Sequence, residues 1–317
     1  MKARVLILSV LCLLAAGTLS LFVGKYPLTL EGIFSDPVQQ NIFLRLRLTR
    51  TLVAVFGGFA LGLAGYVFQT VFHNPLASPD VVGVSSGASV GAAFAILFFG
   101  SSAVLVTCSA FLGAILVLLF TLFFSSLQKV PSKAGIVLAG IAVHALAQTA
   151  LTALKLEADP ERELASIEYW LMGSLNDVTP KTLMTVLPVV ITVSALLFLL
   201  FRHILVLTLD DTEATLLGAR VKRTRWSVLL LATLLVAAVI SVTGLISFIS
   251  LLAAHIAKLL LRRHGRALFF LCGIAGSVLL LFADCLTRLT AAELPVSVFT
   301  SLLGAPALIL LIGRKGT

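Results

Sequence analysis

Ten apolar stretches follow one another along the chain, and nearly all are about long enough to cross a lipid bilayer as a helix. A hydrocarbon core about 30 Å thick requires roughly 20 apolar residues per helical crossing. The stretches run from Val5 to Val23, Leu52 to Phe72, Val81 to Phe99, Ala103 to Phe124, Ala134 to Leu154, Leu183 to Phe201, Trp226 to Thr243, Leu245 to Leu261, Ala267 to Leu286 and Leu294 to Gly313. The seventh and eighth merge into one run of 36 residues. As a single helix that run would measure about 54 Å, so we place a break near Thr243 and Gly244.

The polarity pattern also decides the fold class. The strands of a membrane barrel alternate in polarity at every second residue, whereas these stretches are apolar on all sides. A content of 59% hydrophobic and 12% charged residues agrees with a membrane protein. The sequence therefore predicts an all-α polytopic membrane protein with ten transmembrane helices, forming a single transmembrane domain over residues 1–317.

Charged residues predict the orientation, because Lys and Arg are retained on the cytoplasmic side. With the N-terminus inside, 15 of the 23 cations lie on the cytoplasmic side and both termini are cytoplasmic. This sidedness explains the net charge of +9, so nucleic acid is not an expected partner. The first stretch resembles a secretory signal but lacks a convincing cleavage site, which favours an uncleaved helix. The four cysteines lie in apolar stretches without metal or redox spacing and are expected to be packed, reduced thiols.

Three polar connections carry candidate functions. The first outer segment, from Gly24 to Arg50, ends in the cationic cluster Arg45-Leu-Arg47-Leu-Thr-Arg50, on the side where cations are disfavoured. These arginines either snorkel to lipid headgroups or bind carboxylates of an external protein. The outer segment from Lys155 to Lys181 contains an amphipathic run with Tyr169 and Trp170, which predicts a short helix across the mouth of the bundle, either a simple loop or a gate.

The inner segment from Arg202 to Arg225 predicts one short capped helix from Asp211 to Leu217. Asp210 and Glu213 have the spacing of a capping box, and Gly218 can end the helix. The apolar members Ala214 and Leu217 share one side. A helix this short needs a surface to pack on, which is either the inner face of the bundle or a cleft in a cytoplasmic partner.

Glycines four residues apart predict close helix packing near the turn that follows the second stretch. Gly83, Gly87 and Gly91 form one bare helix face that lets another helix approach.

Motifs for nucleotide hydrolysis and zinc chemistry are absent. The sequence contains no phosphate-binding loop, so the chain cannot hydrolyse ATP alone, and it has no zinc-protease motif. Intramembrane ionisable groups are functional candidates, but here they are sparse. Asp284 stands four residues before Arg288, at salt-bridge spacing, and we interpret the pair as structural. His255 is interpreted as a packing or inner-boundary residue. We predict no catalytic residue and no metal site.

Several motifs resemble the permease subunits of the FecCD family, the transmembrane parts of binding-protein-dependent ABC importers for iron-siderophores, haem and cobalamin. The likeness covers nearly the whole chain in order. It is carried by Arg47-Leu-Thr-Arg50-Thr-Leu, Gly62-Leu-Ala-Gly65, Asn74-Pro-Leu-Ala77-x-Pro79-Asp80-x-x-Gly83, Leu217-Gly218, Gly244-x-Ile-Ser-Phe248-Ile, His255-Ile, Ala283-Asp284-x-x-x-Arg288, Glu293-Leu-Pro295-Val and Leu303-Gly-Ala-Pro306.

The resemblance implies a bundle like that of the cobalamin-importer permease in the cytoplasmic membrane of a bacterium. It implies a second permease subunit, identical or different, two cytoplasmic ATPases that bind ATP and Mg²⁺, and a periplasmic or lipid-anchored solute-binding protein. The arginines that match those docking the binding protein are Arg47, Arg50 and Arg288. The helix that contacts the ATPase matches Asp211, Glu213, Ala214, Leu217 and Gly218. Tyr169 and Trp170 match the outer border of the path.

The implied function is passage of an iron chelate such as a siderophore or haem, with no cofactor bound by this chain. A cobalamin permease is the first alternative, and an ATPase-independent carrier or an intramembrane enzyme is a more distant one. The sequence departs from the family pattern at Leu245, Ser250 and Ala254, where the family usually has proline, glycine and proline. We therefore expect a straighter and stiffer eighth helix.

Overall fold

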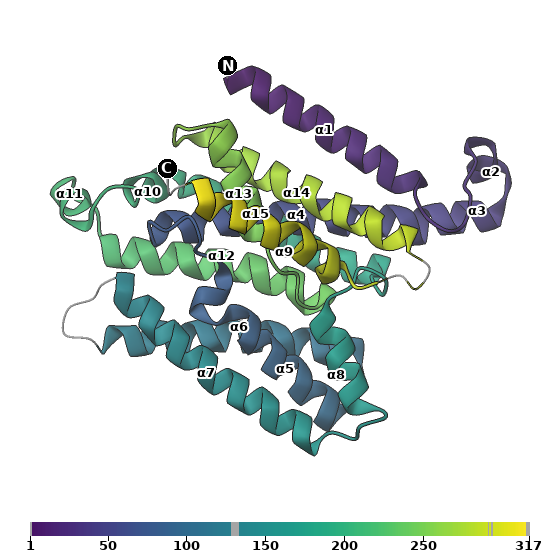
Figure 1. The fold of residues 1–317 in the computed structure, drawn as a ribbon, viewed down its shortest axis with the longest axis horizontal. Coiled ribbons are helices and arrows are strands. Elements are labelled where there is room, and N and C mark those ends of the chain that lie inside the picture. The colour runs from purple at the N-terminus through teal and green to yellow at the C-terminus, as the bar shows by residue number, and fades with distance from the viewer. Residues whose placement is uncertain (1, 128–132, 291, 293, 315–317) are drawn as a thin grey trace. The chain divides into compact units, whose positions relative to one another are not determined.

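The computed structural model describes the backbone of residues 2–127, 133–290, 292 and 294–314, and side chains from residue 3 to residue 309 within those ranges. Lys129, Glu293 and Lys315, which entered the sequence predictions, lie outside the described residues. Every regular element in the described part of the chain is a helix (Figure 1), so the prediction of an all-α fold is confirmed.

Each predicted stretch holds one apolar helix. Among the residues that the structure describes, seven helices are long and apolar enough to cross a membrane: Ala3–Phe22, Pro37–Val71, Ala103–Ser126, Lys133–Glu157, Pro180–Leu199, Val221–Thr243 and Arg266–Leu289. Three apolar helices are shorter: Val84–Phe99, Ile249–Leu260 and Val296–Ile309. The count of ten crossings and the cytoplasmic termini stay predictions.

The long apolar run is broken where the sequence predicts. Helix α12 (Val221–Thr243) ends at Gly244, which has φ 69°, and α13 begins only at Ile249 (Ile249–Leu260). The predicted start of the eighth helix at Leu245 is wrong, because residues 245–248 are not helical. Phe248 adopts φ 67°, a left-handed backbone that interrupts regular helix. Ser250 and Ala254 lie inside α13, whose straightness stays a prediction.

The second span also begins earlier than predicted. A continuous helical segment runs from Pro37 rather than Leu52, and it comprises α3 (Pro37–Asn41), the π-helical segment η1 (Ile42–Leu48) and α4 (Thr49–Val71). Its start is fixed by Asp36, whose carboxylate accepts a hydrogen bond of 2.9 Å from the backbone N–H of Val38, and by Pro37 in the first turn. Polar residues in this segment hid its helical character from a hydropathy argument.

Two compact units divide the chain, and the single domain over residues 1–317 stays a prediction. Unit one comprises Met1–Leu63, Met172–Pro188 and Ile246–Thr317. It contains α1 (Lys2–Phe22), α2 (Leu30–Ser35), α3, η1, α13, α14 (Arg266–Leu289) and α15 (Val296–Arg314), with the first parts of α4 and α9 (Pro180–Leu199). Helix α14 is its centre, since it packs against α1, α13 and α15.

Unit two comprises Ala64–Leu171 and Val189–Leu245. It contains η2 (Pro79–Val82), α5 (Val84–Phe99), α6 (Ala103–Ser126), α7 (Lys133–Glu157), α8 (Glu163–Met172), α10 (Phe201–Val206), α11 (Asp211–Leu216) and α12, with the remainders of α4 and α9. Helices α5 and α6 pack together, α7 lies against both, and α12 packs on α6.

The predicted glycine face lies at the crossing of α5 and α6. A Cβ atom built on Gly87 would overlap the carbonyl oxygen of Gly113, and one on Gly91 would overlap that of Ser109. Only residues without a side chain allow two helix backbones to approach this closely. The prediction of close packing is confirmed for Gly87 and Gly91, whereas Gly83 precedes α5 with φ 80° and is not part of its helix face.

Candidate functional site

Arg47 is positioned by the π-helical segment η1. A π-helix inserts an extra residue per turn and re-aims its side chains. Here Arg45 is exposed, whereas Arg47 is only 7% exposed. The Arg47 guanidinium turns back onto the chain that follows α1, where it donates to the carbonyl oxygen of Val23 and, at 2.9 Å, to that of Tyr26.

Arg50 and Arg288 share one buried carboxylate. The Arg50 Nε atom lies 2.7 Å from Asp284 Oδ1, and its Nη2 atom donates to Thr287 Oγ1 at 2.9 Å. Arg288 pairs with the second oxygen of Asp284, four residues earlier on α14, and donates to the carbonyl oxygen of Ser20 at 2.8 Å. Asp284 is fully buried. The predicted pair of Asp284 and Arg288 is confirmed, and Arg50 joins it.

The three predicted arginines line one cavity of about 290 Å³ in unit one, which we call the cationic pocket. Its polar wall is formed by Lys25, Arg47, Arg50, Asn176 and Arg288. Snorkelling is excluded for Arg47 and Arg288, because both are buried and bound to protein oxygens. The Arg50 side chain keeps 13% of its surface exposed. A carboxylate at this pocket would meet several fixed cations, which matches charge-assisted recognition.

The short helix α11 in unit two is the second candidate site. It spans Asp211–Leu216, one residue shorter than predicted, and Leu217 is its C-cap. Gly218 has φ 79°, its N–H donates to the carbonyl of Thr215, and the N–H of Ala219 donates to the carbonyl of Ala214. This pair of bonds is a Schellman motif, in which the left-handed residue is best filled by glycine. The helix end predicted from Gly218 is therefore confirmed.

Two details of the predicted helix are wrong. The side chain of Asp210 makes no capping hydrogen bond, so the capping box with Glu213 does not form. Ala214 and Leu217 also have different surroundings, since Ala214 is 1% exposed and Leu217 is 69% exposed. Leu216 is even more exposed, at 88%. Ala214 packs on the chain itself, whereas two adjacent leucines face outward.

Asp211 anchors α11 to two other helices. Its carboxylate lies 2.7 Å from Arg225 Nη2 at the start of α12 and 3.5 Å from Lys133 Nζ at the start of α7. Partial burial opposes ionisation of Asp211, but the hydrogen bond and charge of Arg225, together with Lys133, hold its pKa below the usual 3.8.

The Asp211 contacts continue to the turn after α4. Lys133 Nζ lies 3.0 Å from His73 Nδ1, and His73 Nε2 lies 2.6 Å from the carbonyl oxygen of Leu207. His73 adopts φ 49°, which aims its ring in this direction. Sequence reasoning missed these contacts, because a distance of 60 or more residues leaves no local spacing signal.

The predicted outer helix exists as α8. Tyr169 is 47% exposed and Trp170 is half-buried, while Ile167 on the same helix is buried. Glu168 forms an ion pair of 2.8 Å with Lys155 at the end of α7. A gating role for Tyr169 and Trp170 stays a prediction.

Possible metal ligands are dispersed. Within the described residues, no group of three or more His, Cys, Asp or Glu side chains is arranged to hold a metal ion. Cys272 and Cys285 are buried thiols, whereas Cys12 and Cys108 are exposed, so the expectation of packed cysteines is right for two of the four.

Comparison with known proteins identifies relatives along nearly the whole chain. A model of the FecCD transport family matches residues 12–314. The chain is 34% identical over 310 residues to the molybdate import system permease protein MolB of Haemophilus influenzae, covering 93% of this chain and 91% of that protein. It is 35% identical over 296 residues to the hemin transport system permease protein HmuU of Yersinia pestis, covering 90% and 87%. It is 36% identical over 316 residues to the ferric enterobactin transport system permease protein FepD of Escherichia coli, covering 96% and 93%.

A solved structure agrees with these relatives. It is described as an inward-facing conformation of a proposed metal-chelate type ABC transporter, and it superposes with a TM-score of 0.91 at 32% identity. The match covers 98% of this chain and 99% of the other. The named relatives transport chemically different cargoes, from a simple oxyanion to an iron chelate.

Proposed function

Because this chain belongs to the FecCD transport family and is the non-catalytic, multi-pass permease subunit of an ABC importer, we propose that it passes an iron chelate across the cytoplasmic membrane of a bacterium. The family match over residues 12–314 supports this proposal most strongly. Relatives named for hemin and ferric enterobactin favour an iron chelate, while those named for cobalamin and molybdate define the competing cargoes.

The energy for transport comes from partner subunits. Two cytoplasmic ATPases bind ATP and Mg²⁺, a second permease subunit completes the path, and an external binding protein delivers the cargo. This chain binds no cofactor of its own. Binding of ATP closes the ATPases, their surface moves α11, and the helix bundle rocks as a rigid body so that the path opens to the other side.

The exposed leucines of α11 support this coupling role. Leu216 and Leu217 are adjacent, largely exposed and placed on a charged loop. Exposed apolar side chains rimmed by polar residues mark protein-binding surfaces. The ion pairs of Asp211 with Arg225 and Lys133 transmit force from α11 to the starts of α12 and α7.

The coupling role is tested with Leu217→Asp in the reconstituted complex. We expect chelate uptake to be lost while ATP hydrolysis and binding of the external protein continue, because an aspartate buried against the ATPase surface would disrupt the proposed apolar contact. Leu127→Asp is the matched control, since Leu127 is a 64% exposed leucine at the end of α6. Normal uptake with Leu217→Asp would contradict the coupling role of α11.

The cationic pocket supports docking of the external binding protein. Acidic side chains of that protein would reach the pocket through Arg50 and the exposed Lys25, and Arg47 and Arg288 would contribute their fixed charge from deeper positions. Arg50→Gln should weaken docking most at low salt, because exposed charges are screened within about 8–10 Å at physiological ionic strength. Lys181→Gln, an exposed outer cation outside the pocket, is the control. Undiminished docking of a folded Arg50→Gln variant at low salt would contradict this role.

The cargo is tested by uptake in vesicles that contain the assembled importer. Competition among a ferric siderophore, haem, cobalamin and molybdate measures the preference directly. Preferred uptake of cobalamin or molybdate would replace the iron chelate and leave the permease function unchanged.

A further inference from the structure

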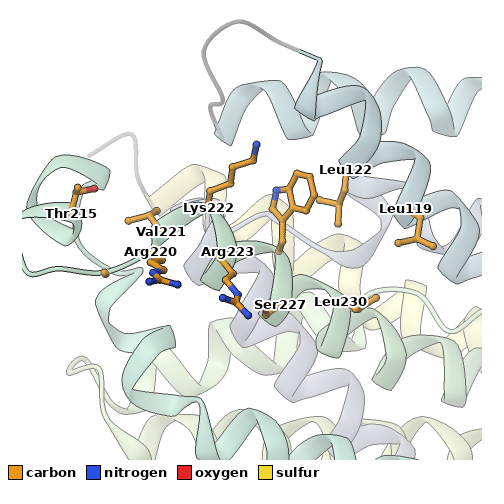
Figure 2. A pocket seen from close by; sticks show the side chains of 11 residues that line it. Leu119, Leu122, Thr215, Arg220, Val221, Lys222, Arg223, Ser227 and Leu230 are labelled. Atoms are coloured by element: carbon orange, nitrogen blue, oxygen red, sulfur yellow. The ribbon is translucent and has the colours of Figure 1, made fainter.

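A groove in unit two lies between the C-terminal part of α6 and the start of α12, and it borders α11 and the turn after it through Thr215 and Ala219. Its volume is about 740 Å³, which lies in the range of small-molecule binding sites. Figure 2 shows the cations Arg220, Lys222 and Arg223 at one end of the groove and Leu119, Leu122 and Leu230 at the other. We call it the basic groove.

The charged end of the basic groove is not neutralised by the chain. Arg220, Lys222 and Arg223 are exposed, and none of them forms an ion pair within the described residues. The nearby carboxylate of Asp211 is already paired with Arg225 and Lys133. Helix α12 begins at Val221, so the positive end of its dipole adds to this charge. The groove therefore presents three available cations to an anion.

The other end of the groove is apolar and continues along a membrane helix. Leu119 and Leu122 belong to α6, a candidate span with a mean hydropathy of 2.7. Leu112, Leu116, Leu119 and Phe123 are exposed at the spacing of one helix face. Such a face within a membrane span is covered by lipid chains. An acyl chain can thus enter the groove from the bilayer without leaving an apolar environment.

Trp226 marks the boundary between the two ends. Its ring lines the groove, and Lys222 Nζ lies 5.1 Å from the ring centroid, within cation–π distance. Tryptophan is enriched at the level of lipid headgroups, where its indole combines an apolar body with a polar N–H. The sequence predicts this end of α12 on the cytoplasmic side, where anionic lipids are common.

From this arrangement we propose that the basic groove binds an anionic phospholipid of the cytoplasmic leaflet. Arg220, Lys222 and Arg223 hold the phosphate group, Trp226 lies at the glycerol level, and one acyl chain follows Leu119, Leu122 and Leu230. Free phosphate would bind the cations but leave the apolar wall of the groove uncovered. An acidic protein surface would pair with the exposed cations but leave the groove of about 740 Å³ unfilled. The bound lipid ties the start of α12, and with it the loop that carries α11, to the membrane surface.

The proposal is tested on the full chain purified in detergent. Lipid retention is measured by native mass spectrometry and thermal stability by unfolding, with phosphatidylglycerol, phosphatidylcholine of equal chain length, or inorganic phosphate added. Only phosphatidylglycerol should be retained and should raise the Tm. In the triple variant Arg220→Gln/Lys222→Gln/Arg223→Gln its affinity should fall about a hundredfold, since each cation near the surface contributes about one factor of five.

Two further variants distinguish the lipid from other occupants. The control Arg4→Gln/Arg262→Gln/Arg263→Gln removes three exposed cations outside the groove and should change affinity less than twofold. Ser227→Trp places a large ring in the groove and should weaken the binding of phosphatidylglycerol while leaving all three cations in place.

Three results would overturn the proposal. Equal retention of phosphatidylglycerol by the triple variant would show that the groove is not the lipid site. An equal effect of inorganic phosphate would identify a simple anion site. If the triple variant binds lipid unchanged but no longer retains the ATPase when the assembled importer is purified, the three cations belong to the ATPase surface.

Discussion

The buried carboxylate of Asp284 makes the sharpest prediction about the stability of this permease. Asp284→Asn keeps the size of the side chain but removes its charge. Arg50 and Arg288 would then face a neutral amide, although Arg288 is only 4% exposed and the Arg50 side chain 13% exposed. Two guanidinium groups would share a poorly hydrated space with no counter-charge from this carboxylate.

The magnitude follows from the burial of this network. Removing one partner of a buried ion pair costs about 3–5 kcal/mol, because it leaves an uncompensated buried charge. An unfolding entropy of about 2.1 cal/mol/K per residue amounts to about 0.67 kcal/mol/K for 317 residues, so the loss corresponds to a Tm lower by roughly 5–8 °C. The hydrogen bond from Arg50 to Thr287 remains and places the expected value away from the upper limit.

The buried thiols provide the assay. Cys272 and Cys285 are buried, whereas Cys12 and Cys108 are exposed, so a Cys12→Ser/Cys108→Ser background limits labelling to unfolded chains. The Tm is then the midpoint of thiol labelling on heating in detergent. Asp177→Asn, which removes an exposed carboxylate on the predicted outer side, should change the Tm by less than about 2 °C.

Two results would refute this reasoning. A Tm for Asp284→Asn equal to that of the parent would show that the carboxylate does not hold the two arginines. The double variant Arg50→Gln/Asp284→Asn should recover part of the loss, because only one buried guanidinium is then left without its carboxylate. No recovery in the double variant would assign the loss to packing rather than to charge.

Three further predictions concern backbone and charge in unit two. Gly87→Val should abolish folding or lower the Tm by more than 10 °C, since its side chain would overlap α6, whereas Gly17→Val on the open face of α1 should have little effect on the Tm. Gly218→Ala should weaken ATPase association about fivefold in a pull-down titration, because alanine is strained by about 1 kcal/mol at φ 79°. The Asp211 contact stabilises α11 above the unfolded pKa of 3.8 and is lost as pH falls through its lower folded pKa. Pepsin should therefore cleave the α11 loop of the parent chain faster below pH 3.8 than at pH 5. The Asp211→Asn variant should be cleaved at pH 5 as fast as the parent chain is below pH 3.8.

The helices were predictable because their signal is local. Stretches of apolar residues gave the positions of the spans, Gly244 gave the break between α12 and α13, and Gly218 gave the end of α11. The pairing of Asp284 with Arg288 followed from helical spacing. The starts of polar helices, such as Pro37, were not predictable from hydropathy.

The long-range partners were not predictable, because they depend on which helices meet. Arg50 reaches Asp284 across 234 positions, and Lys133 reaches Asp211 across 78 positions. The direction of the Arg47 side chain depends on a π-helical segment, which residue preferences do not predict. The charges of the basic groove were visible as a run in the sequence, but the apolar wall beside them belongs to α6 and appeared only in the structure.

The outward-facing leucines of α11 have a consequence for the life of the protein in the cell. Leu216 and Leu217 are largely exposed in this chain. If the ATPase covers them as proposed, a permease made in excess of its ATPase exposes both leucines to water and is prone to aggregation or degradation. Balanced synthesis of the subunits is thus a requirement written into two neighbouring side chains.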